Sequence, residues 1–487
     1  MKKMSRVLIL LLAATLVLPA CAAADDPVSD TAEDTTTAET TVAETELSDD
    51  LEKMDFGGVS FTFLTSEVST SQHAVTVYLE DDGDILESAF YRRTQDTADK
   101  YNVKFTDDVI GASSAKTVDL FRQSVSAGDQ AYDVAMLHDR RAFMMTSEGF
   151  FTNIDTLPHT NLEKPYWNQD VNDAIRMQDE TYLAYGSMVL SLYDFTHVLL
   201  FNKDMQTNLK LENPYTLVEN GTWTLDKMAE MMRAARNDAN GDGIYDDKDN
   251  YGMMSWRGVF YMFLLNGCGN TLIEKDADDI PVFTFYNEEF VNSYEKILNI
   301  IHGEQKIYFD AEKDVNNHRV QEIMFPANQV LFWSECISWA KALREMEANF
   351  GILPAPKFDE AQQQYYSCNN GNFFGMSVPV SVSDAERASI IIEALQSAST
   401  DTVLSAYYDI TLKSKYSRDE ESSAMVDIIF DTTTYDCSTV YSLGNVKTSI
   451  YTKASENDKD LASFYNKQQK ALGKTIDKMV EKILELE

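Results

Sequence analysis

The chain has 487 residues, with 79 acidic and 41 basic side chains and a formal net charge of −38. Such an acidic chain repels nucleic acid and anionic membrane surfaces, so we exclude nucleic-acid partners. Its length is ample for two lobes that each bury a hydrophobic core.

Residues 1–21 have the pattern of a secretion signal. Basic residues near the start are followed by an apolar run that is too short to span a bilayer comfortably. The run ends at Leu18, Pro19, Ala20 and Cys21, which together resemble a bacterial lipobox, although proline is unusual there. We therefore expect lipidation at Cys21. An ordinary cleaved signal with a chance cysteine is the alternative.

Residues 22–50 form an acidic segment rich in threonine and alanine that lacks lysine, arginine and aromatic residues. With little apolar surface to bury, it cannot offset the entropy of ordering, and we expect a disordered tether with an end-to-end distance of roughly 30 Å. A lipid anchor and a tether predict an extracytoplasmic protein held on the outer face of the bacterial cell membrane.

Strand and helix patterns alternate in the segment that follows the tether. Apolar spacing predicts strands at 59–64, 103–106 and 132–137, with helices at 85–101 and 118–127 between them. Further strands are expected at 198–202 and 329–333, and further helices at 225–236, 288–301, 385–397 and 467–486. This alternation predicts an α/β fold with a mainly parallel sheet covered by helices on both faces.

Several short segments carry a family resemblance through their order along the chain. They read YDVAMLHDR at 132–140, YLAYG at 182–186, LFNKD at 200–204, WTLD at 223–226, VLFW at 330–333 and FGILPAP at 350–356. In this order they resemble extracellular solute-binding protein family 1, the relatives of maltose-binding protein.

The resemblance implies a two-lobed fold of the type II periplasmic-binding-protein class. The ligand cleft would lie between lobes that are joined by a hinge crossed several times by the chain. Carried onto this sequence, lobe 1 comprises 51–190 and 372–415, and lobe 2 comprises 191–371 and 416–487. The role of the extended C-terminal region is left open.

The resemblance further implies a monomeric, non-enzymatic protein that captures a small ligand and delivers it to the membrane subunits of an ABC importer. We expect an oligosaccharide, whose identity and length stay open. The sequence has no His-Glu-x-x-His, Gly-x-Ser-x-Gly or complete phosphate-loop motif. A surface-anchored glycoside hydrolase is the alternative, because it would have the same location, a similarly acidic composition and similar aromatic residues. A tethered adhesion or scaffold module is a third interpretation.

Sugar sites combine aromatic rings for stacking with polar side chains for hydrogen bonds. By the resemblance, the residues expected to face the cleft are His138, Asp139, Arg140, Tyr193, Asp194, Trp256, Arg257 and Trp333. Each has a structural alternative, because aromatic residues near strand ends often belong to the core and neighbouring Asp and Arg often form a solvated pair. Trp223 and Trp339 are expected to pack in the core.

An acidic segment beginning at residue 238 matches the spacing of a calcium loop. Oxygen ligands at positions 1, 3, 5, 7 and 9 and a glycine at position 6 are typical of such loops. The expected ligands of a structural Ca²⁺ are Asp238, Asn240, Asp242, the carbonyl of Ile244, Asp246 and Asp247, with Asp249 as the alternative to the last. An acidic turn without a metal is the other interpretation.

Four further cysteines match no zinc or redox spacing. They are Cys268, Cys336, Cys368 and Cys437. Their disulfide pairing is left open, and an arrangement without any disulfide is equally compatible with the sequence.

Overall fold

The computed structural model describes residues 49–486 except 67–76, 112–113, 278, 310–313, 316–317, 320, 342, 344–345, 348, 372, 409–418 and 441–442. The predicted signal peptide, the lipidation at Cys21 and nearly all of the predicted tether lie outside the described residues. Within this part of the chain, no helix has both the length and the apolar character needed to cross a membrane.

The first sheet has four strands in the order β14-β3-β1-β2. Their bounds are β1 (Val59–Ser66), β2 (Val103–Ile110), β3 (Val134–His138) and β14 (Phe374–Ser377). β1 pairs in parallel with β2 and β3, whereas β14 runs antiparallel to β3. β1 buries Phe61, Phe63 and Leu64 completely. The predicted parallel arrangement is confirmed for the first three strands of this sheet.

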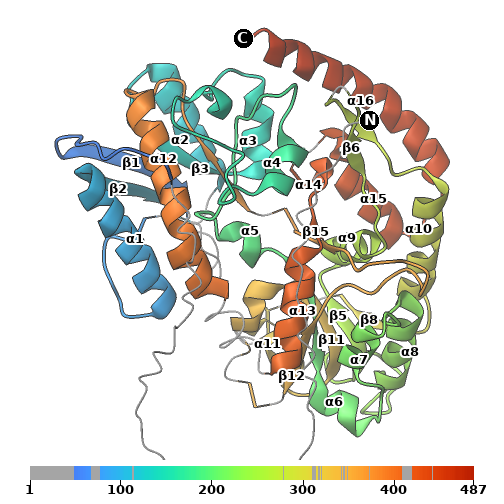
Figure 1. Cartoon of the computed structure of the whole chain (residues 1–487). Helices are drawn as coiled ribbons and strands as arrows, with labels where there is room; N and C mark the ends of the chain where they lie inside the picture. Colours follow the sequence, from blue (N-terminus) through green and yellow to red (C-terminus); the bar gives the residue numbers. More distant parts are fainter. Residues whose placement is uncertain are drawn as a thin grey trace, which may run out of the picture. The chain divides into compact units, whose positions relative to one another are not determined.

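Four helices accompany the first sheet (Figure 1). They are α1 (Ile85–Tyr101), α2 (Ser114–Ala127), α3 (Asp139–Thr146) and α12 (Ala385–Ser399). α1 begins after Asp84, whose side chain accepts a hydrogen bond from the Leu86 amide, and it ends at Asn102 in a left-handed conformation. α1 contacts α12 and β2, while α2 contacts β1 and β3. These caps explain why the bounds of α1 match the prediction.

The second sheet has five strands in the order β12-β4-β11-β5-β8. Their bounds are β4 (His197–Asn202), β5 (Tyr251–Ser255), β8 (Ile307–Tyr308), β11 (Val330–Cys336) and β12 (Phe350–Leu353). β11 is parallel to β5 but antiparallel to β4, and every residue of β4 is buried. The prediction of a mainly parallel sheet is wrong here, because β4 runs against both of its neighbours.

Five described helices of six or more residues lie in the stretch that forms the second sheet, and a sixth, α13, comes from later in the chain. They are α6 (Lys203–Asn208), α7 (Pro214–Glu219), α8 (Leu225–Ala235), α9 (Arg257–Gly267), α10 (Glu288–Ile301) and α13 (Glu420–Asp431). α8 contacts β5 and β11, and α6, α7 and α13 contact β12. Thr224 caps α8 and Asn287 caps α10. Trp223 is fully buried at the start of α8, as predicted.

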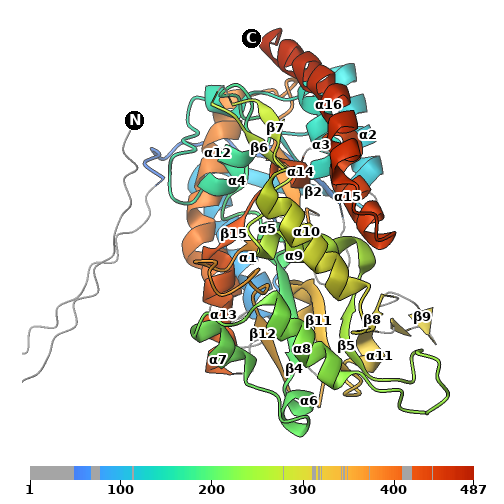
Figure 2. The same cartoon turned by 90° about the vertical axis from the view of Figure 1, so that its right-hand side faces the viewer.

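The C-terminal region contains α14 (Cys437–Val440), α15 (Val446–Ser455) and α16 (Leu461–Leu484). α15 contacts α9 and α14 contacts α3, so this region touches helices that accompany both sheets (Figure 2). α16 starts six residues before its predicted start, because the Asp460 side chain caps it by accepting a hydrogen bond from the Ser463 amide.

Short elements complete the described fold. They are α4 (Gln169–Ile175), α5 (Ser191–Asp194), α11 (Gln321–Met324), β6 (Ile273–Lys275), β7 (Pro281–Phe283), β9 (Asp314–Val315), β10 (His318–Arg319), β13 (Ser367–Cys368) and β15 (Thr433–Thr434). The strands of the first sheet fall within the segments predicted for lobe 1, and those of the second within the segments predicted for lobe 2. The exact lobe boundaries stay predictions.

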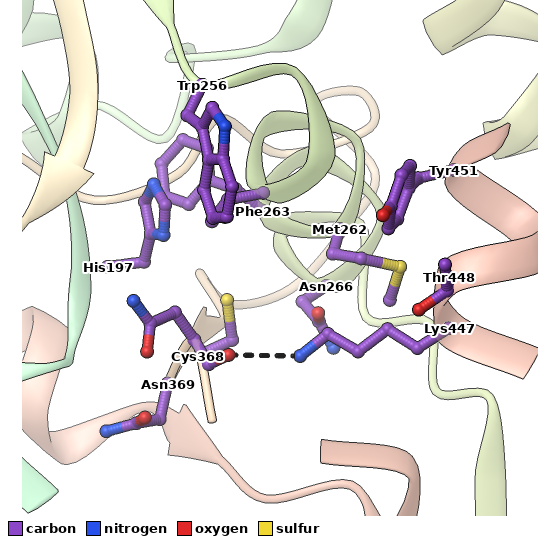
Figure 3. Close-up of a pocket in the computed structure, with 12 residues that line it drawn as sticks. His197, Trp256, Met262, Phe263, Asn266, Cys368, Asn369, Lys447, Thr448 and Tyr451 are labelled. Carbon is purple, nitrogen blue, oxygen red and sulfur yellow. Dashed lines mark hydrogen bonds between the residues drawn. The ribbon is translucent and has the colours of Figure 1, made fainter. Parts of the chain in front are cut away.

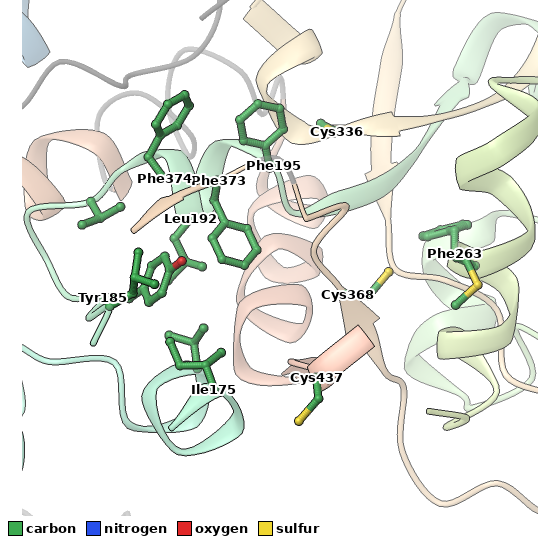
Figure 4. Packing of buried hydrophobic residues seen from close by; sticks show 14 of the residues in the cluster. Ile175, Tyr185, Leu192, Phe195, Phe263, Cys336, Cys368, Phe373, Phe374 and Cys437 are labelled. Carbon is green, nitrogen blue, oxygen red and sulfur yellow. The ribbon is translucent and has the colours of Figure 1, made fainter. Parts of the chain in front are cut away.

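Two segments of the chain connect the sheets and pair with each other. Thr196, just before β4, forms an antiparallel bridge with Asn369, which follows β13. The Asn370 amide donates to the Phe195 carbonyl at 3.1 Å, and the Asn369 side chain donates to the Leu192 carbonyl. Figure 4 shows the apolar packing at these crossings, where Phe195 and Leu192 lie near Phe373. The crossings are therefore hydrogen-bonded and have an apolar core of their own.

Candidate functional site

A cavity of about 100 Å³ opens beside the paired crossings (Figure 3). Its walls come from the start of β4, from α9, from the segment after β13 and from α15. The lining residues are His197, Trp256, Val259, Met262, Phe263, Asn266, Cys368, Asn369, Asn370, Lys447, Thr448 and Tyr451. The cavity is thus built from segments that lie more than 250 residues apart in the sequence, as His197 and Tyr451 do.

The topology of the second sheet explains why these segments meet. β5 ends at Ser255, directly before Trp256, and the parallel strand β11 ends at Cys336. β4 starts at His197, which pairs with Cys336 because the two strands are antiparallel. The cavity therefore lies at the carboxyl edge of β5 and β11, which is where α/β sheets place their ligands.

Trp256 gives the cavity an exposed aromatic surface. It occupies the N-cap position of α9 without making a side-chain capping bond, and 46% of its surface is exposed. The rings of His197 and Phe263 lie nearby at a centroid distance of 4.7 Å. An exposed indole beside buried rings offers a ligand a flat apolar face.

His197 is buried to 1% exposure yet lines the cavity. Its Nε2 forms a 2.9 Å hydrogen bond with the Ser334 hydroxyl, whereas its Nδ1 has no partner. Burial lowers the pKa of His197 to about 3, and the positive charge of Lys447 acts in the same direction. The imidazole is therefore neutral near pH 7, and its Nδ1 is available to donate or accept a hydrogen bond.

The opposite wall is polar and held by hydrogen bonds. Lys447 Nζ donates to the Asn370 carbonyl at 3.2 Å, and Asn266 donates to the Asn270 carbonyl at 3.0 Å. Asn369 Oδ1 accepts from the Gly371 amide at 2.9 Å. These bonds fix amide and ammonium groups before any ligand arrives, which lowers the entropy cost of binding.

Of the residues predicted to face the cleft, Trp256 is the one whose described side chain lines this cavity. Tyr193 and Asp194 lie at the first crossing in α5, as expected, but they pack inward. The Tyr193 ring contacts Tyr407 and Phe430, and Asp194 accepts a 2.8 Å hydrogen bond from the Tyr407 hydroxyl. Both residues therefore stabilise the crossing in this structure.

Trp333 is a correction to the predicted site. Its side chain is completely buried against the rings of Phe325 and Trp339, at centroid distances of 5.6 and 5.8 Å. Adjacent strand residues point to opposite faces of a sheet, and Ser334 is the neighbour that points towards His197. Trp333 consequently belongs to the core and offers no surface to a ligand.

The side chains of His138, Asp139, Arg140 and Arg257 lie outside the described part of the structure. Their backbones are placed: His138 ends β3 opposite Phe374, Asp139 starts α3 and Arg257 starts α9. These positions are at the carboxyl ends of β3 and β5, as predicted. Their ligand contacts stay predictions.

Sequence reasoning missed His197, Asn369, Asn370, Lys447 and Tyr451. His197 carried a usable signal, because it is a polar residue directly before the apolar run 198–201. Lys447 and Tyr451 carried none, since they lie in the C-terminal region whose place in the fold was left open.

Two larger hollows lie elsewhere, with volumes of about 380 and 700 Å³. The larger is lined by Glu212, Asp226, Glu230, Asp359 and Glu360 among others, and the smaller lies between the start of α10 and the start of α16. Neither lies at a strand end or contains an unpartnered buried side chain among the described residues. Of these three cavities, the one at His197 is therefore the best candidate for a ligand site.

The predicted calcium loop is exposed and held together by its own amides. Asp238 accepts from Gly241 and Gly243, while Asn240 and Asp242 each accept from the amide two residues later. These oxygens are of the kind that calcium prefers, and each keeps acceptor capacity. Within the described residues, however, no three His, Cys, Asp or Glu side chains gather closely enough to hold a metal. The donor chemistry fits an ion, and the calcium site stays a prediction.

Asp249, the predicted alternative to Asp247 as the last calcium ligand, holds the loop together by hydrogen bonds. Asp249 is fully buried, and its two carboxylate oxygens accept hydrogen bonds from the Ala239 and Asp246 amides, each at 2.9 Å. It thereby joins the two ends of the loop. Ile244, whose carbonyl was expected to bind the ion, is 65% exposed.

The four cysteines that the structure describes are free thiols. Burial raises the pKa of Cys268, Cys368 and Cys437 to about 12 in each case. These thiols therefore stay protonated at neutral pH and are inert towards ordinary thiol chemistry.

Comparison with known proteins identifies the fold. No protein-family model and no curated protein sequence matches the chain. Solved structures do match. One is an ABC substrate-binding protein from Listeria monocytogenes in complex with cycloalternan, with a TM-score of 0.55 and 13% sequence identity. The match covers 86% of this chain and 99% of that one. The fold is that of the two-lobed ABC solute-binding proteins.

Two further structures with this fold are similar to the chain. A cyclo/maltodextrin-binding protein complexed with maltotetraose has a TM-score of 0.54 at 14% identity and covers 87% of this chain and 97% of that one. A maltose/maltodextrin-binding domain from Bdellovibrio bacteriovorus, bound to maltotriose, has a TM-score of 0.54 at 13% identity, with coverages of 86% and 100%. At such low identity the likeness establishes the fold, and the function is argued from the site.

Proposed function

We propose that this chain is an extracytoplasmic solute-binding protein that captures a carbohydrate, expected to be an oligosaccharide, and delivers it to an ABC importer. The fold supports a binding protein, and the similar structures hold cycloalternan, maltotetraose and maltotriose. The observation that carries the proposal is the exposed ring of Trp256 beside the neutral, buried His197 in the lining of a cavity at the chain crossings.

This arrangement suits capture because it provides both parts of a sugar site. Trp256 offers a stacking face, while His197, Asn369 and Asn370 offer directed hydrogen-bonding groups. The position beside the paired crossings means that a rotation about them would change the shape of the cavity. Ligand binding would then be coupled to closure by hinge motion, as in other two-lobed binding proteins.

A binding role is favoured over glycoside hydrolysis by the chemistry of the wall. Hydrolysis of a glycosidic bond ordinarily uses two carboxyl groups on either side of the bond. The described residues that line the cavity include no aspartate and no glutamate. We therefore propose that the chain is not an enzyme and releases its ligand unchanged.

The location of the protein in the cell is also a proposal. The lipobox-like segment ending at Cys21 and the acidic tether at 22–50 support a lipid anchor on the outer face of the cell membrane. Each chain would then act as a monomer that moves within reach of the importer's membrane subunits. We also propose that the loop starting at Asp238 takes up a structural Ca²⁺, supported by the spacing of its oxygen-bearing residues.

A thermal-shift screen over a carbohydrate panel that includes maltotriose and maltotetraose tests the proposed function. A ligand at one hundred times its Kd stabilises the folded state by about 2.7 kcal/mol, which raises the melting temperature measurably. The saccharide should be recovered intact after long incubation with a stoichiometric amount of protein. Release of shorter products would favour the hydrolase, and a panel without any stabilising saccharide would contradict carbohydrate capture.

A further inference from the structure

The charge of the cavity wall is opposite in sign to that of the whole chain. Among the described lining residues, Lys447 is the one charged side chain at neutral pH, since His197 is neutral there and no aspartate or glutamate is present. The chain as a whole carries a formal charge of −38. Carboxylates commonly accept hydrogen bonds from the hydroxyls of neutral sugars. This wall instead presents a cation and amide groups.

The ammonium group of Lys447 is fixed in this wall. It donates to the Asn370 carbonyl at 3.2 Å, and that carbonyl belongs to the segment crossing between the sheets. Burial is the main cause of the raised pKa of the Cys368 thiol, whereas the positive charge of Lys447 acts to lower that pKa. Asp436 acts on the same thiol, but its carboxylate accepts hydrogen bonds from the amides of Leu272, Ile273 and Ser438. The amides therefore bind that negative charge outside the lining of the cavity.

A second group in the cavity is suited to an anion. His197 Nδ1 has no hydrogen-bond partner in a residue with 1% exposure. When Nε2 accepts from the Ser334 hydroxyl, Nδ1 carries the proton and is a donor. An unpaired buried polar group costs free energy, so an acceptor that reaches it gains both the bond and the removal of that cost.

We propose that the cavity receives the carboxylate of an acidic saccharide, a uronic-acid oligomer, with Lys447 pairing with the charge and His197 Nδ1 donating to a carboxylate oxygen. This inference rests on the proposed carbohydrate capture and names its substrate class. The negative charge of the rest of the chain opposes an anion only weakly, because salt screens exposed charges beyond about 8 Å at physiological ionic strength. The contact with Lys447 therefore decides the preference.

Matched ligands test the preference directly. Trigalacturonate and triglucuronate are compared by calorimetry with their methyl esters, which keep the rings and hydroxyls but lack the charge. Maltotriose serves as the neutral reference. We expect at least one of the two acids to bind at least tenfold more tightly than its ester.

Variants then assign the effect to a residue. Lys447→Met should abolish the preference for the acid, and Lys447→Arg should keep most of it. Lys467→Met is the matched control, because it removes one positive charge from an exposed position on α16 that does not line the cavity. Circular dichroism and the melting temperature show whether each variant folds. If Lys447→Met does not fold, the comparison of acid and ester in the parent protein still decides whether the ligand is an acidic saccharide.

Each outcome separates this inference from the proposed function. Equal or tighter binding of both esters, or binding of maltotriose alone, overturns the acidic ligand and leaves carbohydrate capture standing. A preference for an acid that survives in Lys447→Met overturns the role of Lys447. If no saccharide in the wider carbohydrate panel binds, the inference and the proposed function fail together.

Discussion

Replacing Trp256 with alanine should weaken ligand binding while leaving the fold intact. A tryptophan side chain presents up to roughly 250 Å². Because 46% of Trp256 is exposed, on the order of 100 Å² is available to a ligand. At about 25 cal/mol per Å², complete coverage contributes about 2.5 kcal/mol. A sugar ring covers one face of the indole, so we expect a loss of about 1.5 kcal/mol, which is roughly a tenfold increase in Kd.

Isothermal titration calorimetry with the saccharide selected by the thermal-shift screen measures this change. Trp256→Phe keeps a planar ring and should lose less affinity than Trp256→Ala. The melting temperature of both variants should stay near that of the parent, because the indole makes no capping bond to α9. Trp333→Phe is the opposite control: its ring is fully buried, so it should lower stability with little effect on Kd. Unchanged affinity in Trp256→Ala would refute the placement of the site.

Three further predictions concern stability and reactivity. Burial raises the pKa of Asp107 to about 6 in the folded state, so the native protein binds more protons than the unfolded chain between about pH 4 and pH 6. Its free energy of unfolding should therefore fall as pH rises through that window. In urea titrations, Asp107→Asn should stabilise the protein at pH 7.5 by on the order of 1–2 kcal/mol, with the gain shrinking towards pH 4, and a gain that does not change with pH would contradict the raised pKa. Calcium should raise the melting temperature of the protein, and EDTA should reverse the increase. Asp249→Asn should not show this increase. An unchanged melting temperature, together with no bound metal by elemental analysis, would contradict the metal site. The four buried or half-buried cysteines should resist a thiol reagent in the native protein and all react after unfolding in guanidinium, and rapid native labelling would contradict their inert environment.

Local rules predicted the elements well where caps and periodicity agreed. The helices at 85–101 and 288–301 have the predicted bounds, because Asp84 and Asn287 cap their first turns in addition to the apolar spacing. The direction of a strand is not encoded locally. β4 was predicted as a strand, but its antiparallel placement follows from the crossing at Thr196, which pairs with a residue more than 170 positions away.

The site was harder to predict than the fold, because it too depends on placement that is not encoded locally. Trp256 and Trp333 were both predicted to face the cleft, and the sequence offers nothing to separate an exposed ring from a buried one. The structure separates them, because Trp333 occupies the face of β11 opposite Ser334, whereas Trp256 follows the end of β5. Lys447 comes from a region with no recognisable pattern, and it reaches the cavity only because α15 packs on α9.

Tryptophan fluorescence combined with product analysis tests the central claim most directly. Trp256 is the most exposed of the five tryptophans, while Trp167, Trp223 and Trp333 are almost completely buried and Trp339 is partly buried. Titration with the saccharide from the screen should give a saturable change in emission at one ligand per chain, lost in Trp256→Phe, with the saccharide recovered intact. Saturable binding with no change in the emission of Trp256, or conversion of the saccharide to products, would contradict the account.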